Sequence, residues 1–351
     1  MLTRVARLYG TRDLRVETQP MQPIGPGEVL LRMAAGGICG SDLHYYQDGG
    51  FGPVRVREPI IAGHEASGFV ESIGKDVVGI APGMLVAVNP SQPCGQCHYC
   101  GIGQPIHCLS MRFMGSAMRL PHEQGLFRDR MVVPAIQCHP VSGAVTPAEA
   151  ACAEPLAVCL HAVAQSGDLS GARVLVTGAG PIGLLTVAAI RHAGAADIVV
   201  TDLSDAALSR APAMGATATL NVASDPDSLA PWQVDKGRFD VVFDCSAAGP
   251  ALRSAFAAVK PRGTIVQVGV TGDITIPLNA LVGKEIVWRG SQRFDREFAE
   301  AVALISSRAI DVRPIITHAF PLEKAVEAFE QAGDRSVACK VQITFGDAHR
   351  P

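Results

Sequence analysis

The chain has 351 residues, of which 48% are hydrophobic and 18% charged, and its formal net charge is −3. This composition predicts two domains with a sizeable core, and the small, scattered charge argues against a nucleic-acid or membrane partner. We find no apolar run long enough to span a membrane and no secretory signal. We therefore expect a cytoplasmic protein whose ten cysteines are thiols or metal ligands rather than disulfides.

The first 150 residues contain short apolar runs, such as EVLLRMAA and SGFVESIG, separated by Gly and Pro. They predict an all-β, loop-rich domain. Cys39, His64 and Glu65 lie within it, and Glu154 follows it. A thiolate, an imidazole and a carboxylate are the ligands of an open zinc site. Each also has a simpler explanation: Cys39 as a small buried side chain, His64 as a hydrogen-bonded core residue, and Glu154 as an acid in the first turn of a helix.

Four cysteines fall within fifteen residues of the segment NPSQPCGQCHYCGIGQPIHC, namely Cys94, Cys97, Cys100 and Cys108. Two C-x-x-C turns, with glycines between them, favour a tetrahedral zinc site with four thiolate ligands. An iron–sulfur cluster and unliganded thiols are the alternatives. Because four ligands leave no open position on the ion, we expect this site to hold a loop in place rather than to catalyse a reaction.

From about residue 151 to residue 290, strands alternate with helices, which predicts a doubly wound α/β fold. The strand RVLVT precedes Gly178, Gly180 and Gly183, which form G-x-G-x-x-G and open a helix that runs to about Ala193. This unit is typical of a dinucleotide site, with the pyrophosphate at the helix N-terminus. The segment PALRSAFAAVKPRG reads as a later helix closed by its Pro and Gly, and KVQITF as a strand that returns to the first domain.

Asp202 ends the second strand of this unit and is expected to bind the ribose hydroxyls, which favours NAD over NADP. Arg210 lies nearby and leaves NADP open. Ligands sit beyond the carboxyl ends of parallel strands, so residues near 269 and 291 should border the nicotinamide. The expected cofactor contacts are Gly178, Gly180, Pro181, Ile182, Gly183, Asp202, Leu203, Arg210, Val268, Gly269 and Ser291.

GHEASGFVESIG, the four-cysteine segment, AEPLAV and VTGAGPIG together resemble the zinc-dependent medium-chain dehydrogenase/reductase family, over essentially the whole chain. The resemblance implies a GroES-like catalytic domain over 1–150 and 291–351 and a Rossmann domain over 151–290. It also implies one catalytic and one structural zinc ion, NAD or NADP, and a homo-oligomer, dimer or tetramer. The glutamate in AEPLA points to the polyol branch. GGICGSDLHYYQDGG, NPSQPCGQCHYC and MRFMGSAMRLPHEQG resemble the L-idonate 5-dehydrogenase family, which forms 5-keto-D-gluconate.

By this resemblance, Cys39 and His64 would ligate the catalytic zinc, with Glu65 or Glu154 as the acidic ligand. Ser41 matches the hydroxyl that passes the substrate proton inward, and His44 matches the residue that delivers it to solvent. A turn hydroxyl and a surface histidine are the simpler explanations of these two residues.

A sugar acid requires a partner for its carboxylate, and an arginine fork suits it. Arg112 and Arg293 are the candidates, with a surface salt bridge as the alternative for each. Tyr45 could bind a sugar hydroxyl or serve only in packing. GLFRDRMVV lacks the Ala-Glu-Tyr of many relatives, so the pocket wall is expected to differ. Two other functions remain open: a sorbitol or xylitol dehydrogenase, and a catalytically silent nucleotide-binding protein.

Overall fold

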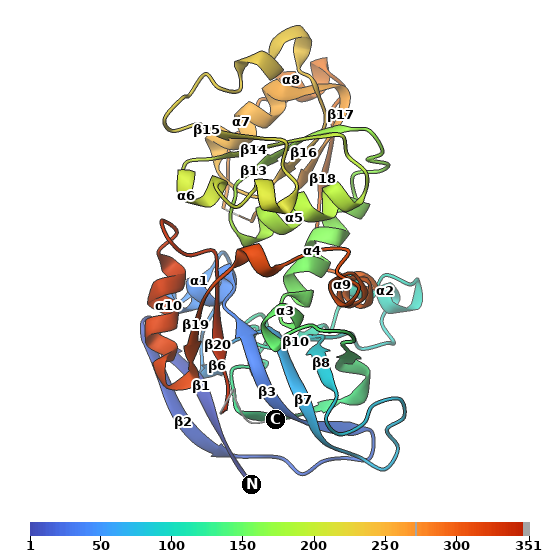
Figure 1. Ribbon diagram of the computed structural model, residues 1–351, viewed down its shortest axis with the longest axis vertical. Coiled ribbons are helices and arrows are strands. Elements are labelled where there is room, and N and C mark those ends of the chain that lie inside the picture. The colour runs from blue at the N-terminus through green and yellow to red at the C-terminus, as the bar shows by residue number, and fades with distance from the viewer. Residues whose placement is uncertain (271, 347–351) are drawn as a thin grey trace.

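The computed structural model describes residues 1–270 and 272–346. Figure 1 shows a β-rich part below a parallel sheet, with helix α4 (Ala153–Ala164) passing from one to the other. This arrangement confirms the α/β prediction of a GroES-like part joined to a doubly wound part. Among the residues described, no helix is long and apolar enough to cross a membrane.

The main sheet of the β-rich part has seven strands in the order β12-β8-β7-β3-β20-β19, with β11 also paired to β3. Most residues of β3 are buried and none is exposed, and the first four residues of β7 are all buried, so these two central strands are covered on both faces. The strands are β3 (Glu28–Gly37), β7 (Glu65–Ile73), β8 (Leu85–Val88), β11 (Arg130–Pro134), β12 (Cys138–Pro140), β19 (Ile316–Pro321) and β20 (Lys340–Thr344).

Smaller elements surround this sheet. The short sheets contain β1 (Leu2–Gly10), β2 (Asp13–Pro20), β4 (Gly50–Phe51), β5 (Val54–Arg55), β6 (Ile60–Ile61), β9 (Ser91–Gln92) and β10 (Arg112–Phe113). The helices are α1 (Gly40–Asp48), α2 (His98–Gly101), α3 (Pro147–Ala150), α9 (Glu297–Ser306) and α10 (Ala325–Gly333). The C-terminal strands β19 and β20 belong to the same sheet as β3, near the start of the chain, because β20 pairs antiparallel with β3. The strand predicted from KVQITF therefore returns to the first part of the chain.

The upper sheet has the order β15-β14-β13-β16-β17-β18, and all its pairings are parallel. This order reverses between β13 and β16, where a doubly wound sheet opens its ligand crevice. The strands are β13 (Arg173–Thr177), β14 (Asp197–Asp202), β15 (Ala218–Asn221), β16 (Phe239–Asp244), β17 (Val259–Gln267) and β18 (Val287–Gly290), and the helices are α5 (Pro181–His192), α6 (Asp205–Leu208), α7 (Gly249–Ala258) and α8 (Leu278–Gly283).

One sequence prediction in this region was wrong. The helix expected to continue to Pro261 and Gly263 ends at Ala258, and strand β17 begins at the next residue. The pairing of β17 with β16 shifts register between Phe239 and Val241. A proline has no N–H to donate, so it is tolerated at such an irregularity of a strand but not inside a helix.

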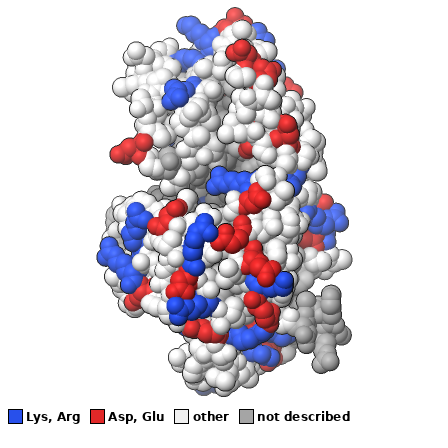
Figure 2. All heavy atoms as spheres, turned by 90° about the vertical axis from the view of Figure 1, so that its left-hand side faces the viewer, with Lys and Arg blue, Asp and Glu red and all other residues white. Residues whose placement is uncertain are grey.

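Figure 2 shows the face that carries α10, and Lys and Arg are interspersed there with Asp and Glu. Several of these charges are paired, for example Arg12 with Glu330 at 2.8 Å and Arg15 with Asp13 at 2.7 Å. This face therefore presents no large area of one sign, in agreement with the scattered charge of the sequence.

Candidate active site

Cys39, His64 and Glu65 are brought together by the pairing of β3 with β7. In this antiparallel register Gly37 lies opposite Glu65. Cys39 follows β3 as the N-cap of α1, and His64 immediately precedes β7. One ligand atom of each of the three side chains lies within 4.8 Å of the others. Thiolate, imidazole and carboxylate at this separation fit a zinc ion.

Asp42 is a buried acid beside this group that the sequence analysis did not identify. Its carboxylate accepts hydrogen bonds from the backbone N–H of Cys39 at 3.0 Å and of Gly63 at 3.1 Å, and lies 3.8 Å from Nδ1 of His64. Burial lowers the pKa of His64, but the charges of Asp42 and Cys39 outweigh it and the net shift is well upward. Asp42 therefore fixes the backbone on both sides of the group and favours positive charge at its centre.

Lys340, at the start of β20, is the second residue that the sequence analysis missed. Its Nζ donates to both carboxylate oxygens of Glu65, at 2.8 and 2.7 Å, and to the carbonyl of Ile38 at 3.2 Å. Both side chains are almost completely buried. Burial lowers the pKa of Lys340, but the charge of Glu65 raises it above its usual value, so the ammonium stays charged. No motif could have revealed a pair separated by 275 residues.

Glu154 lies in the first turn of α4 and is only 5% exposed. Burial raises its pKa to about 7, against the opposing charge of His64, while the charge of Glu65 raises it further. Glu154 is not one of the three residues of this group, but the charges of two of them, His64 and Glu65, act on its carboxylate. The site thus has two carboxylates: that of Glu65 is paired with the ammonium of Lys340, and that of Glu154 has a pKa of about 7.

The two candidate arginines occupy different environments. The guanidinium of Arg293 lies 4.1 Å from the ring centre of Phe113, whose ring lies 5.6 Å from that of His64. Burial lowers the pKa of Arg293, and the charge of Glu154 opposes this. One nitrogen of the guanidinium also lies 2.9 Å from the sulfur of Met118. Arg112 is 61% exposed and forms a fork to the carboxylate of Glu123, at 2.6 and 3.0 Å.

The remaining candidates near the substrate space lie on α1. Tyr45 is buried, and its hydroxyl accepts the backbone N–H of Ala117 at 3.2 Å. Ser41 is half-buried, two residues after Cys39. His44 is exposed, with Nδ1 3.0 Å from the carboxylate of Asp48. The helix therefore extends from the cysteine to solvent, which is the direction that a proton relay requires.

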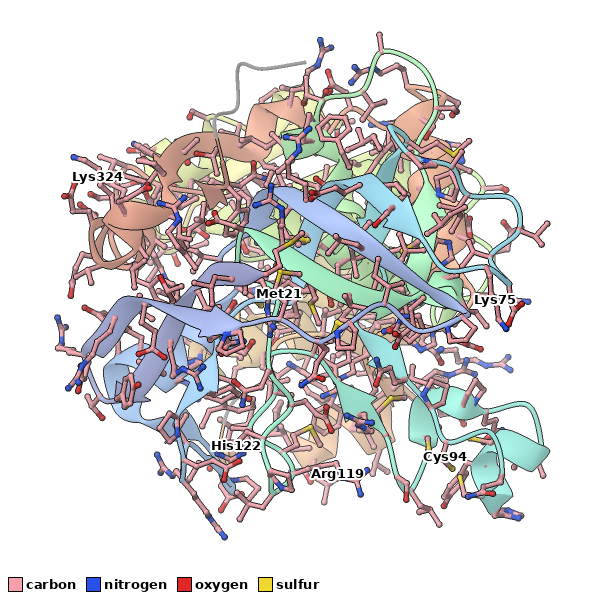
Figure 3. The ribbon with its side chains drawn as sticks, turned by 90° about the horizontal axis from the view of Figure 1, so that it is seen from below. Met21, Lys75, Cys94, Arg119, His122 and Lys324 are labelled. Atoms are coloured by element: carbon pink, nitrogen blue, oxygen red, sulfur yellow. The ribbon has the colours of Figure 1, made fainter. Side chains whose placement is uncertain are left out.

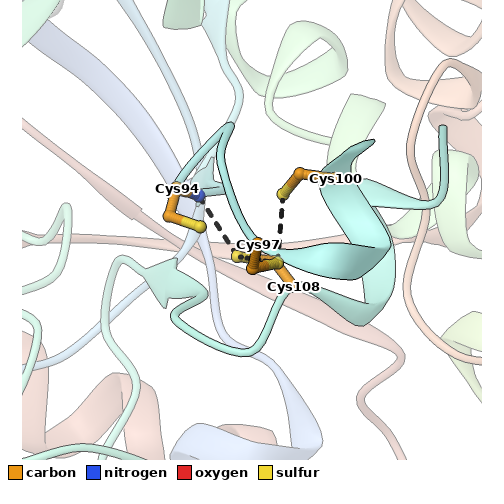
Figure 4. A group of neighbouring side chains, drawn as sticks. All are labelled: Cys94, Cys97, Cys100 and Cys108. Carbon is orange, nitrogen blue, oxygen red and sulfur yellow. Dashed lines mark hydrogen bonds between the residues drawn. The ribbon is translucent and has the colours of Figure 1, made fainter. Parts of the chain in front are cut away.

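The four cysteines Cys94, Cys97, Cys100 and Cys108 converge as Figure 4 shows. The sulfur of Cys97 lies 3.6 Å from that of Cys100 and 3.9 Å from that of Cys108. These separations are far too long for a disulfide, and four sulfurs around one zinc are about 3.8 Å apart. All ten cysteines are free. The donor set and spacing fit a closed zinc site, which we call the four-cysteine lobe (residues 94–108).

Backbone N–H groups lower the pKa of Cys94 and Cys97 in this lobe, whereas burial raises the pKa of Cys100 to about 12. The N–H groups of Cys100 and Leu109 lower the pKa of Cys97 to about 6. The N–H groups of Cys94 and Ser110 point at the sulfur of Cys108, at 3.1 and 3.3 Å. Figure 3 shows Cys94 at the periphery of the molecule, so this lobe lies outside the main sheet.

The glycine-rich turn has the geometry of a phosphate site. Gly178 has φ of 93°, and a Cβ on Gly183 would lie 1.8 Å from the carbonyl oxygen of Gly178, so only glycine allows this packing. A Cβ on Gly180 would meet nothing within 4 Å, which leaves space above the turn. Pro181 and Ile182 begin α5, whose N–H groups face that space.

Asp202 closes the turn from the next strand. Its carboxylate accepts the N–H of Ala179 at 2.6 Å and the N–H of Leu203 at 2.7 Å. The guanidinium of Arg210 donates to a carbonyl of its own helix at 2.6 Å and to the carbonyl of Val337 at 3.0 Å. The acid therefore lies at the turn, while the arginine joins α6 to the segment that precedes β20.

Two buried oxygens lack partners where the nicotinamide was expected. Oγ of Ser291 and Oε1 of Gln267 have no hydrogen-bond partner among the residues described. The backbone of this edge is fixed, because the N–H groups of Val268 and Gly269 donate to the carbonyl of Asp244 at 2.9 and 2.8 Å. Buried polar atoms are normally paired, so these oxygens fit the amide of a bound nicotinamide nucleotide.

Comparisons with known proteins agree with this geometry. Residues 25–143 match the alcohol dehydrogenase GroES-like domain, and residues 181–307 match the zinc-binding dehydrogenase family. The chain belongs to the zinc-dependent medium-chain dehydrogenase/reductase family, and it is an oxidoreductase acting on CH–OH donors. The family resemblance inferred from the sequence motifs is thereby confirmed.

Individual relatives cover nearly the whole chain. The chain is 41% identical to the NAD(P)-dependent L-idonate 5-dehydrogenase of Escherichia coli K12, over 90% of this chain and 91% of the relative. It is 38% identical to the sorbitol dehydrogenase of Pongo abelii, over 92% and 90%. The crystal structure of L-idonate 5-dehydrogenase from Escherichia coli superposes with a TM-score of 0.94 at 39% identity, covering 98% of this chain and 99% of that one.

Proposed function

We propose that this enzyme oxidises a secondary hydroxyl of a sugar acid and reduces NAD. The proposed substrate is L-idonate, and the product is 5-keto-D-gluconate. One observation carries the sugar-acid part: the half-buried guanidinium of Arg293 lies over the ring of Phe113, which is next to His64, and the charge of Glu154 acts on this arginine. A carboxylate-bearing substrate would bring its charge to this arginine and its hydroxyl to the metal ligands. The likeness to L-idonate 5-dehydrogenase supports the same assignment.

Cys39 and His64 are the proposed ligands of the catalytic zinc, with Glu65 or Glu154 as the acidic ligand. A zinc ion bound there would act as a Lewis acid toward the substrate hydroxyl, and a nicotinamide ring would accept the hydride. The four-cysteine lobe is proposed to hold a second, structural zinc.

The side chains of this protein perform the remaining tasks. Arg293 is proposed to orient the substrate by binding the carboxylate of the sugar acid, and Tyr45 is proposed to bind a sugar hydroxyl. The aromatic rings of Phe113 and Phe294, 6.5 Å apart, exclude water from the substrate space. Ser41 and His44 are proposed to carry the released proton along α1 to solvent.

The glycine-rich turn and Asp202 are proposed to bind the pyrophosphate and the adenosine ribose. The carboxylate of Asp202 repels a 2′-phosphate, and Arg210 is engaged by two carbonyls, so NAD is the preferred cofactor and NADP the second. Free thiols at all ten cysteines suit a reducing compartment, and we propose the cytoplasm.

We also propose that two copies associate through the edge of the parallel sheet. Strand β18 is the last strand of that sheet, and each of its residues is exposed, including Val287 and Trp288. An exposed apolar edge strand offers unpaired backbone groups to a second copy. Analytical ultracentrifugation tests this: a Trp288→Glu variant should sediment as a smaller species than the unaltered protein.

NADH formation tests the substrate, with L-idonate, sorbitol and xylitol compared at equal concentrations. We expect L-idonate to be the preferred substrate. Arg293→Ala should raise its KM while leaving that of the polyols unchanged, and Arg112→Ala should have a far smaller effect because Arg112 is held by Glu123. A KM for L-idonate that Arg293→Ala leaves unaltered would contradict the sugar-acid assignment.

A polyol dehydrogenase is the second candidate, favoured by the sorbitol dehydrogenase among the relatives. It predicts turnover that is indifferent to negative charge on the substrate. Sorbitol and xylitol oxidised well, with L-idonate not oxidised, would establish this second function in place of the first.

A further inference from the structure

The turn that carries Arg293 (residues 291–296) is held in a strained conformation. Arg293 has φ of 47°, in the left-handed region that a non-glycine residue adopts only when its surroundings enforce it. The turn begins at Ser291, whose N–H donates to the carbonyl of Gln267 at 2.9 Å. Phe294 is buried between Phe113 and the first turn of α9. The direction of the arginine therefore depends on what holds the other end of the turn.

Glu297 holds that other end. Oε2 of Glu297 accepts the backbone N–H of Asp295 at 2.9 Å, and Oε1 lies 3.1 Å from Nδ1 of His161 on α4. Nε2 of His161 lies 3.3 Å from the amide nitrogen of Gln165, so both nitrogens of the ring have a polar neighbour. Burial raises the pKa of Glu297, but the bonds from His161 and Asp295 outweigh it and hold the pKa at about 2.

Helix α4 thereby connects the metal side of the site to the substrate arginine. Glu154 and His161 are seven residues apart on this helix, which is two turns and about 10 Å along one face. Glu154 lies beside His64, while His161 reaches the turn of Arg293 through Glu297. The residue beside the metal ligands and the residue that holds the turn of Arg293 are therefore carried by one rigid element, while Phe113 holds the guanidinium itself.

We propose that His161 and Glu297 are positioning residues that set the reach of Arg293 toward the substrate carboxylate, and so the preference of the enzyme for acidic over neutral sugars. This inference rests on the proposed function. Neither side chain touches the reacting atoms. Their role is to keep the strained turn at a fixed distance from the metal ligands. The carboxylate of the substrate can then bind Arg293 while its hydroxyl lies at the metal site.

Kinetics of Glu297→Ala and His161→Ala test the proposal. We expect the KM for L-idonate to rise about tenfold, the size of one lost charge-assisted hydrogen bond, with kcat and the KM for NAD nearly unchanged. The KM for xylitol, which has no carboxylate, should not move. Glu297→Gln should restore part of the loss, because its amide oxygen still accepts a hydrogen bond.

Two controls separate positioning from general damage. Arg308→Gln breaks the ion pair with Glu149 beyond the opposite end of α9, and it should leave the KM for L-idonate unchanged. In an Arg293→Ala background, Glu297→Ala should add no further rise in KM, because its effect passes through the arginine. An additive rise, or an equal rise for xylitol, would overturn the proposal.

Amide hydrogen exchange of the same variants gives a readout that needs no turnover. Exchange at Asp295 and Phe298 should accelerate in Glu297→Ala and remain slow in Arg308→Gln. If the unaltered enzyme does not oxidise L-idonate, the proposed function fails, whereas unchanged exchange at this turn in Glu297→Ala refutes the positioning role by itself.

Discussion

The two clusters that we propose as metal sites are built in opposite ways. The four-cysteine lobe takes all its ligands from fifteen consecutive residues, three of them half-exposed, at the periphery of the molecule. The buried group of Cys39, His64 and Glu65 takes its ligands from the ends of β3 and β7 and is completed by Lys340 from β20. The first cluster depends on a loop and the second on a whole sheet.

This difference determines what each cluster can do. A peripheral loop with four thiolates would gain part of its order from a bound ion. The buried group has its geometry imposed by strand register and by Asp42, which accepts hydrogen bonds from the backbone N–H groups of Cys39 and Gly63. Preorganised ligands that leave one coordination position open suit catalysis. Four protein ligands that fill every position suit a structural role.

The largest expected effect is on turnover. Cys39→Ser should reduce kcat/KM about a thousandfold or more, because Lewis-acid assistance contributes several kcal/mol to the transition state. The fold should remain, since serine is a good N-cap for α1. Steady-state kinetics, circular dichroism and zinc analysis measure the three parts. A Cys39→Ser enzyme with full activity would end the catalytic assignment of the buried group.

The second largest effect is expected on stability, when the buried ammonium of Lys340 is removed. Lys340→Met leaves the carboxylate of Glu65 buried without its partner, and we expect a loss of about 3 to 5 kcal/mol in the free energy of unfolding. Urea denaturation measures it. The double variant Lys340→Met with Glu65→Gln should recover part of the loss, because no unpaired charge remains. Equal instability of single and double variants would argue against the ion pair as the cause.

Lowering the pH should reveal the contribution of Glu297 to the free energy of unfolding. Its pKa is held at about 2, below its ordinary value of 4.5, so its stabilising contribution is complete above that ordinary value and is lost as the pH falls toward 2. Between pH 6 and pH 3 the unaltered protein should lose about 1 to 3 kcal/mol more than Glu297→Gln does. Denaturant midpoints at several pH values measure the difference, and parallel curves for the two proteins would contradict it.

The smallest global effect is expected in the four-cysteine lobe. Cys100→Ser should make residues 94–108 about tenfold more sensitive to proteases, because the lobe loses the ion that orders it. The parallel sheet and the buried group do not rest on this lobe, so the main thermal transition should move little. Mass spectrometry of timed digests locates the cleavage, and a collapse of the whole fold would show that the two clusters are not independent.

Local signals predicted most of the fold and part of the site. The glycine-rich turn, the strand before it and the four cysteines each lie within one short segment, so their spacing alone indicates their geometry. Asp42 had a weak signal, as an acid in the first turn of the helix that Cys39 caps. The extent of the helix before Pro261 was misjudged because the register shift in β17 has no local pattern.

Contacts between distant segments could not be predicted. Lys340 meets Glu65 across 275 residues, and His161 meets Glu297 across 136. The sequence does not distinguish Arg112 from Arg293, and only the fold shows that Arg112 is paired with Glu123 at the surface while Arg293 lies over the ring of Phe113.

The position of Lys340 in the chain also affects how the protein is made. Synthesis proceeds at roughly 5 to 20 residues per second, so about 14 to 55 seconds separate the appearance of Glu65 from that of Lys340. During that interval the newly made carboxylate has no cation, and the segment Ala35–Gly37 of β3 has no β20 beside it. The two partners of this buried ion pair are therefore made far apart in time, and the proposed catalytic centre is complete only after β20 has been synthesised.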